Sequence, residues 1–224
     1  KSGVCDSLLS NVVTVTVNLS SVGGSLAGNA TVCTGTNSTL FTLSGRVGNV
    51  VKWQSSTVSD FNSNITDINN TSTTLTASSL TATTYYRAVV KNGVCTTANS
   101  STGTVTVFTP PVGGSVTFTS GASAICSGGT AGTMTLAGGY TGTIQKWQSS
   151  RDSLFSSPTD IAIATATYTP ASGSVTQTTW YRAVLITGSG ACTSFSTAAK
   201  LTVDPTTVGG TISGPTGLCN GNSV

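Results

Sequence analysis

Apolar and polar residues alternate along much of the chain, in short runs separated by clusters of glycine, serine, threonine and asparagine. A period of two residues, with threonine, valine and tyrosine prominent, is typical of half-buried β-strands. We find no convincing amphipathic helix. Strands are expected in the first half of the chain at residues 38–45, 50–56, 73–80, 83–90 and 102–108. Short strands with turn signals between them predict an all-β fold built as an antiparallel sandwich.

The alternation assigns side chains to the faces of the predicted sheets. In the run VVKWQSS (50–56), Val51 and Trp53 are expected to share one face. Lys52 and Gln54 are expected on the opposite face.

The run TTYYRAVV (83–90) divides in the same way, with one face carrying Tyr86, Ala88 and Val90 and the other carrying Tyr85, Arg87 and Val89. Trp53 and Tyr86 are expected in the core, by analogy with the tryptophan and tyrosine of immunoglobulin domains. Asn92-Gly93 follows this run and predicts a tight hairpin of type I′, because both central residues of that turn need positive φ.

The same motifs recur at intervals of 90 to 97 residues, which indicates a tandem repeat. The recurring segments are VGGS at 22–25 and 112–115 with VGGT at 208–211, KWQSS at 52–56 and 146–150, TTYYRAVV at 83–90 with TTWYRAVL at 178–185, and KSGVC at 1–5 with KNGVC at 91–95 and, more loosely, GSGAC at 188–192. By this correspondence Trp147 and Tyr181 are the second copy's core residues.

The phase of the repeat predicts four segments. Residues 1–19 are expected to be the C-terminal end of a preceding repeat, 20–108 and 109–204 two whole repeats, and 205–224 the start of a following repeat. The junctions are short and two of them contain proline, which restricts φ. We expect tandem immunoglobulin-like sandwiches arranged end to end as a rod, with the chain a section of a longer array.

Six cysteines allow fifteen pairings, and spacing alone does not choose among them. Repeat phase favours one bridge in each whole repeat, with pairs Cys33–Cys95 and Cys126–Cys192, while Cys5 and Cys219 pair outside the chain. A rival scheme crosses the junctions, with pairs Cys5–Cys33, Cys95–Cys126 and Cys192–Cys219. The first scheme requires Cys33 to lie on a first-strand segment that runs beside the last strand. Structural disulfides imply an extracytoplasmic setting.

The composition argues against several functions. Only 7% of residues are charged, and the chain has no histidine and no glutamate. The usual catalytic triads and histidine metal sites are therefore absent, there is no CxxC pair, and we expect neither an enzyme nor a cofactor. The net charge of +3 comes from scattered residues, so we expect no nucleic-acid partner. No run is long enough for membrane insertion.

The solvent-facing side of the central strands offers a possible sugar-binding surface. Its residues are Lys52, Gln54, Tyr85 and Arg87 in the first repeat and Lys146, Gln148, Trp180 and Arg182 in the second. In the alternative interpretation, which we favour, Arg87 covers Tyr85 on a solvated sheet as a cation–π contact.

The combination of VGG–x8–C, KWQSS, TTYYRAVV and NGVC resembles the immunoglobulin-like repeats of giant Bacteroidota surface proteins, including gliding-motility adhesins exported by the type IX secretion system. The resemblance implies an extracellular, surface-attached filament. Its expected partners are neighbouring repeats, surface polysaccharide and other filaments. It also implies O-glycosylation at Asp-Ser-Leu triplets, at Ser7 and Ser153.

These observations predict a structural and adhesive stalk segment of a long repetitive bacterial adhesin. The alternative is a carbohydrate-binding or spacer module of a secreted multidomain enzyme.

Overall fold

The computed structural model describes residue 3 and residues 11–214. The chain forms two compact units, which are described separately. Unit 1 comprises the chain up to Pro110 together with Gly188–Cys192, and unit 2 comprises Pro111–Thr187 and the chain from Thr193. Both units are all-β, and the prediction of tandem immunoglobulin-like sandwich repeats is confirmed.

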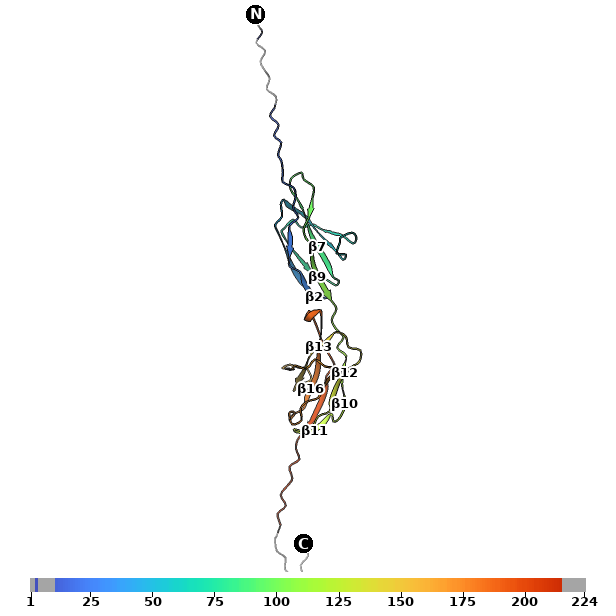
Figure 1. The fold of residues 1–224 in the computed structure, drawn as a ribbon. Coiled ribbons are helices and arrows are strands. Elements are labelled where there is room, and N and C mark those ends of the chain that lie inside the picture. The colour runs from blue at the N-terminus through green and yellow to red at the C-terminus, as the bar shows by residue number, and fades with distance from the viewer. Residues whose placement is uncertain (1–2, 4–10, 215–224) are drawn as a thin grey trace, which may run out of the picture. The chain divides into compact units, whose positions relative to one another are not determined.

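Unit 1 is a sandwich of two sheets. Its strands are β1 (Ser25–Ala27), β2 (Ala30–Cys33), β3 (Ser38–Ser44), β4 (Asn49–Ser56), β5 (Thr66–Ile68), β6 (Thr74–Ser78), β7 (Thr84–Lys91), β8 (Ala98–Asn99) and β9 (Gly103–Phe108). One sheet has the order β1-β3-β6. The other has the order β2-β9-β7-β4-β5, with β8 also paired to β7 (Figure 1).

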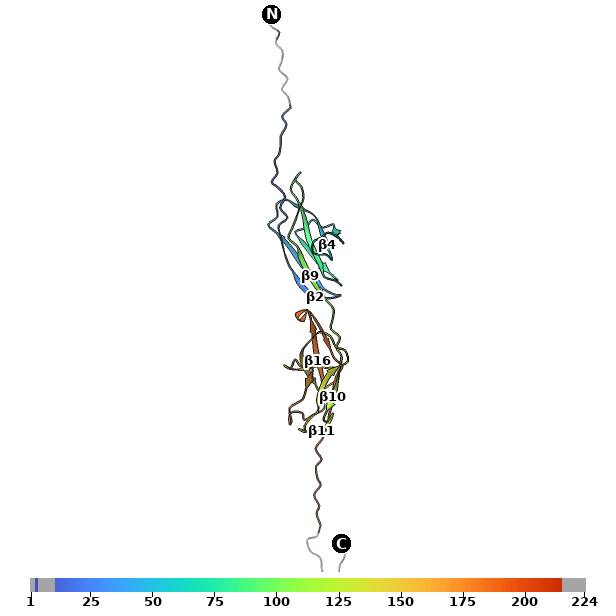
Figure 2. The same cartoon turned by 45° about the vertical axis from the view of Figure 1, so that its right-hand side comes forward.

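Unit 2 repeats this topology. Its strands are β10 (Ser115–Ser120), β11 (Ala124–Cys126), β12 (Thr133–Ala137), β13 (Thr143–Ser150), β14 (Thr159–Ile161), β15 (Thr167–Tyr168), β16 (Thr179–Thr187), β17 (Cys192–Phe195) and β18 (Ala199–Asp204). The sheets have the orders β10-β12-β15 and β11-β18-β16-β13-β14, with β17 paired to β16, so β10 and β16 lie in different layers (Figure 2). The only helical segment among the described residues is the 3₁₀ turn Gly188–Gly190, so none there is long or apolar enough to span a membrane.

Each sandwich has its own apolar core around a tryptophan. Trp53 and Trp147 are fully buried, and Tyr86 and Tyr181 are 5% and 4% exposed. Each indole N–H is satisfied by a backbone carbonyl, because Trp53 donates to Ser72 O at 3.0 Å and Trp147 to Thr165 O at 2.9 Å. Burial of each tryptophan therefore leaves its indole N–H hydrogen-bonded.

The predicted alternation across residues 50–56 is wrong at one position. Val50, not Val51, shares the buried face with Trp53, and Val51 is 40% exposed. A β-bulge between Val50 and Lys52 in the pairing of β4 with β7 inserts one extra residue and shifts the alternation. Lys52 still lies on the opposite face from the tryptophan.

The hairpin after β7 is also longer than predicted. Residues 92–97 separate β7 from β8, and only Gly93 of the Asn92-Gly93 pair has positive φ (53°). Cys95 N–H donates to Asn92 O at 3.0 Å and closes the turn. The result is a broader loop that carries Cys95, in place of a two-residue type I′ turn.

The first strand of each repeat divides and changes sheet, which the sequence pattern did not predict. β1 pairs with β3, whereas β2 pairs in parallel with β9. Gly28 lies between β1 and β2 with φ of 115°, and a Cβ there would lie 2.2 Å from Leu40 O. Only glycine fits both the backbone angle and the close approach. This crossing brings Cys33 beside the last strand.

Candidate functional site

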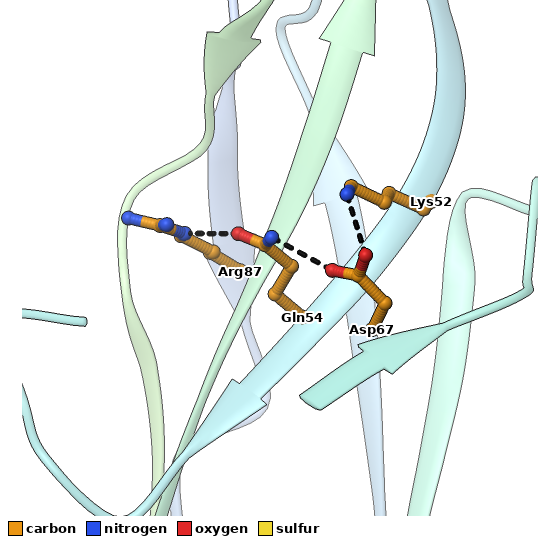
Figure 3. A network of polar contacts seen from close by, with 4 residues as sticks. All are labelled: Lys52, Gln54, Asp67 and Arg87. Atoms are coloured by element: carbon orange, nitrogen blue, oxygen red, sulfur yellow. Dashed lines mark hydrogen bonds and ion pairs between the residues drawn. The ribbon is translucent and has the colours of Figure 1, made fainter. Parts of the chain in front are cut away.

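A chain of polar contacts crosses three neighbouring strands on the outer face of unit 1. Lys52 Nζ and Gln54 Nε2 donate to the two carboxylate oxygens of Asp67, at 2.7 and 2.8 Å. Arg87 Nε donates to Gln54 Oε1 at 2.8 Å (Figure 3). The strand register places these groups together, because Gln54 on β4 lies opposite both Asp67 on β5 and Arg87 on β7. We call these four residues the strand-face network.

Unit 2 contains the same network. Lys146 Nζ and Gln148 Nε2 donate to Asp160 at 2.6 and 2.8 Å, and Arg182 Nε donates to Gln148 Oε1 at 2.9 Å. The register is equivalent, with Gln148 opposite Asp160 and Arg182. The sequence interpretation found the lysine, glutamine and arginine but missed both aspartates. The tripeptide TDI, at 66–68 and 159–161, is the signal that could have found them.

Each arginine of the network packs on a phenylalanine rather than on the neighbouring strand aromatic. The guanidinium carbon of Arg87 lies 4.2 Å from the ring centroid of Phe61, which corrects the predicted contact with Tyr85. Arg182 lies 4.1 Å from Phe155 and 3.8 Å from Phe195.

The phenylalanines under the arginines occupy a strained backbone. Phe61 and Phe155 have φ of 56° and 55°, which bulky residues rarely adopt, and are 5% and 7% exposed. Asp152 holds the second loop by accepting backbone N–H groups of Leu154 and Ser156. Both repeats thus place a phenylalanine with positive φ in the loop that follows the KWQSS strand.

In each network the lysine and the aspartate form an ion pair, and the glutamine amide links this pair to the arginine. The hydrogen bonds from Lys52 and Gln54 lower the pKa of Asp67, and those from Lys146 and Gln148 lower the pKa of Asp160. Desolvation lowers the pKa of Arg182. Among the described residues, no buried side-chain nitrogen or oxygen lacks a partner. The arrangement joins three strands and holds its polar groups against one another.

The aromatic residues proposed for sugar stacking lie outside this network. Tyr85 and Trp180 are half-buried. Lys200 Nζ lies 5.5 Å from the ring centroid of Trp180. The structure therefore places a lysine from the neighbouring strand over one of the two predicted stacking rings.

A hydroxyl-rich pocket of about 270 Å³ lies within unit 2. Arg151 lies at this pocket and donates to Gln177 O and Thr179 Oγ1, both at 2.7 Å. Burial, with a smaller contribution from Tyr168, raises the pKa of Tyr181 to about 12. The lining residues are Ser149, Ser150, Arg151, Ser157, Thr159, Ile161, Tyr168, Ser174, Val175, Thr179 and Tyr181.

The cysteines pair differently from both predicted schemes. Cys33 bonds to Cys192, with 5.0 Å between their Cα atoms, and Cys95 and Cys126 are free thiols. The predicted pairs Cys33–Cys95 and Cys126–Cys192 are therefore wrong. Cys5 and Cys219, with the predicted glycosylation site Ser7, lie outside the described residues.

Strand direction explains why the predicted pair fails. Cys33 lies on a first-strand segment beside the last strand, as that pairing required, but its register partner is Phe108 at the end of β9. β7 starts near this end at Thr84 and finishes at Lys91, seven residues further along. At about 3.3 Å per residue the loop with Cys95 begins about 23 Å away. A disulfide needs Cα atoms within about 7 Å.

Ser153, the other predicted glycosylation site, is exposed in the loop after β13. The adjacent Asp152 carboxylate accepts hydrogen bonds from the Ser150 and Ser156 hydroxyls. The hydrogen bond from the backbone N–H of Ser156, followed by that from the Ser150 hydroxyl, lowers the pKa of Asp152.

The chain is similar to solved structures of low sequence identity. Two solved structures are similar, each with a TM-score of 0.44: a Ca²⁺-stabilised adhesin that helps an Antarctic bacterium reach out and bind ice, and fibronectin(III)-like modules of CbhA from Clostridium thermocellum. The adhesin is 15% identical, over 85% of this chain and 51% of its own, so this chain spans about half of that structure. The CbhA modules are 14% identical, over 80% of this chain and 94% of theirs.

No curated protein matches the sequence. A domain of unknown function, DUF8696, matches at residues 22–109 and again at 114–205. The chain therefore belongs to the DUF8696 family, of which it carries two consecutive copies.

Proposed function

We propose that this chain is a structural segment of a long, repetitive, extracellular bacterial adhesin, in which it acts as a spacer. The observation that carries the proposal is the recurrence of the strand-face network in both repeats. A ligand-binding surface presents polar groups to a partner, whereas Lys52, Gln54, Asp67 and Arg87 bond to one another and join β4, β5 and β7. The second copy connects β13, β14 and β16 in the same way.

The disulfide supports a location outside the cytoplasm. A bridge such as Cys33–Cys192 persists in oxidising compartments and is rare in reducing ones. The short junctions, two of which contain proline, support an end-to-end arrangement of repeats. The resemblance to Bacteroidota repeats extends the proposal to type IX secretion, surface attachment and gliding motility, with O-glycosylation at the exposed Ser153.

The proposal is tested on the parent protein. Antibodies raised against this chain would probe intact cells, with and without external protease, followed by large-pore electrophoresis of the extracts. A very large, protease-sensitive species on the cell surface is the expected result. A modest secreted species that copurifies with hydrolase activity would contradict the proposal and would favour a spacer module of an enzyme.

A second candidate function is carbohydrate binding by unit 2. The supporting observation is the hydroxyl-rich pocket, where Arg151 and Tyr168 lie among serine and threonine side chains. Calorimetry with neutral and acidic oligosaccharides tests it, with Arg151→Ala as the disrupting variant. Thr57→Ala changes the residue that follows KWQSS in the first repeat and is the matched control. Saturable binding that only Arg151→Ala abolishes would support this function, and equal heats from all three proteins would exclude it.

A further inference from the structure

Unit 1 contains a short segment of the second sequence repeat. Gly188–Cys192 clusters with the first 110 residues, and Cys192 is only 1% exposed there. Its Sγ atom lies 3.3 Å from Phe108 O, and a Cβ on Gly188 would lie 2.6 Å from the Phe108 ring. Phe108 is the register partner of Cys33, and its carbonyl oxygen also accepts Thr34 N–H at 2.8 Å. The end of β9 therefore holds both cysteines of the bridge.

The corresponding loop of the first repeat has the same geometry around the preceding junction. The Sγ atom of Cys95 lies 3.8 Å from Asn18 O and 3.3 Å from Leu19 O, and Asn92 Nδ2 donates to Leu19 O at 2.8 Å. Gly93 has positive φ, and a Cβ there would lie 2.5 Å from the Asn18 side chain. Asn18 and Phe108 each lie four residues before the valine of a VGG motif. Cys95 therefore lies against the residues that precede the first VGG motif, as Cys192 lies against those that precede the second.

The corresponding strand of the second repeat repeats the geometry around Cys33. Cys126 ends β11, which runs parallel to β18, and its register partner is Asp204. Ser127 N–H donates to Asp204 O at 3.2 Å, as Thr34 does to Phe108. Cys126 is an exposed free thiol. Like Cys33, it lies beside the C-terminal end of the last strand of its own sandwich, but it has no disulfide partner.

We propose that Cys33–Cys192 is one link of a repeating series. In each link, the cysteine that follows the VGG motif of one repeat bonds to a cysteine of the next repeat. That second cysteine is the one that corresponds to Cys95 in the loop between β7 and β8. Cys126 is then the attachment site for a following copy, and Cys95 the attachment site for a preceding copy. Among the six cysteines of the sequence, this rule pairs only Cys33 with Cys192, which is the bridge that forms.

The chemistry of each link is thiol–disulfide exchange. One thiolate attacks a disulfide oxidant, such as oxidised glutathione, and forms a mixed disulfide. The second thiolate displaces the remaining glutathione, so two protons and two electrons leave the protein and two reduced thiols are released. The proposal concerns covalent connection between repeats and holds whether or not the array is an adhesin.

The test begins with the chain itself, oxidised with glutathione, alkylated and mapped as non-reduced peptides. We expect one bridge, Cys33–Cys192, and alkylation of Cys95 and Cys126. A Cys33–Cys95 or Cys126–Cys192 peptide would overturn the proposal.

The second step adds a repeat. Residues 22–108 replace everything after Thr207, which keeps the natural spacing to the VGG motif, and Cys95→Ser in the original copy makes the added Cys95 unique. We expect Cys126 to lose its alkylation and to appear bonded to the added KNGVC peptide. Formation of Cys33–Cys192 in the same sample shows that the chain has folded. A folded chain in which Cys126 stays alkylated would overturn the proposal, whatever the surface experiments on the parent protein show.

Discussion

Cys33 and Cys192 are 159 positions apart in the sequence and 5.0 Å apart between Cα atoms, and they are covalently bonded. The bond is possible because β2 runs parallel to β9, so Cys33 lies at the end of the sandwich where the chain leaves for the next repeat. Strands β3 to β16 lie within the loop that this bond closes, whereas β1, β2 and β18 lie outside it. The bridge is therefore expected to dominate both the stability and the mechanical behaviour of the chain.

Cys192→Ser should lower the free energy of unfolding by about 2–5 kcal/mol, because closing a long loop restricts the unfolded chain. The measurement is urea unfolding of oxidised wild type and variant, followed by tryptophan fluorescence. Cys95→Ser is the matched control and should unfold at the wild-type urea concentration, since Cys95 has no disulfide partner in this chain. Equal midpoints for Cys192→Ser and wild type would contradict the stabilising role of the bridge.

Gly28→Ala should impair formation of the bridge. A Cβ at Gly28 would lie 2.2 Å from Leu40 O. This clash should disfavour the change of sheet that places Cys33 beside β9, at a cost of about 1–3 kcal/mol. Gly35→Ala is the control, because Gly35 has a similar φ of 102° but no atom within 4 Å of the added carbon. Free-thiol titration after oxidation should show more unbonded Cys33 in Gly28→Ala alone. Equal bridging in the two variants would show that the close approach does not guide Cys33.

The stability of both units should fall in acid as the network aspartates are protonated. Asp67 and Asp160 have pKa values below the usual value of about 3.9, so they stabilise the fold above that pH and lose this effect as the pH falls through their folded-state pKa values. In Asp67→Asn with Asp160→Asn, the midpoint of urea unfolding should depend less on pH below about pH 4 than in wild type. Asp204→Asn, at the end of β18, is the control. An unchanged slope in the double variant would show that the network does not couple protonation to folding.

Ser100→Ala should destabilise unit 1 by about 1–3 kcal/mol, because a buried N–H loses its acceptor. Ala88 N–H donates to Ser100 Oγ at 2.9 Å, and Ala88 is fully buried. Ser196 has the same role for Ala183 in unit 2, with 2.8 Å between nitrogen and oxygen. Thermal unfolding is the measurement, with the exposed Ser59→Ala as control. A Ser100→Ala variant as stable as Ser59→Ala would mean that water replaces the lost acceptor.

The strands and the core could be predicted from the sequence because each depends on local alternation. The run at 38–45 contains β3, and the repeated KWQSS and YYRAV motifs lie on the paired strands β4 and β7. The bulge at Val51 could not be read from the run, because it depends on how β4 pairs with β7.

The cysteine pairing and the full network depend on contacts between distant segments. Repeat phase correctly indicated that Cys126 is the second copy of Cys33 and Cys192 the second copy of Cys95, but it did not show at which end of the sandwich each lies. That depends on the sheet change at Gly28 and on the parallel register of β2 with β9. Asp67 and Phe61 were missed because neither belongs to a long alternating run, and only the strand register and the loop conformation bring them to Arg87.

Single-molecule pulling from the two ends of the chain tests the mechanical role of the Cys33–Cys192 bridge most directly. In the oxidised protein, tension passes through the Cys33–Cys192 bond, so the segment between these residues bears no load. Reduction exposes that segment, which extends by at most about 550 Å at about 3.5 Å per residue. We expect two unfolding steps of up to about 300 Å after reduction and no such step before it. Full-length steps in the oxidised protein, equal to those after reduction, would contradict the account.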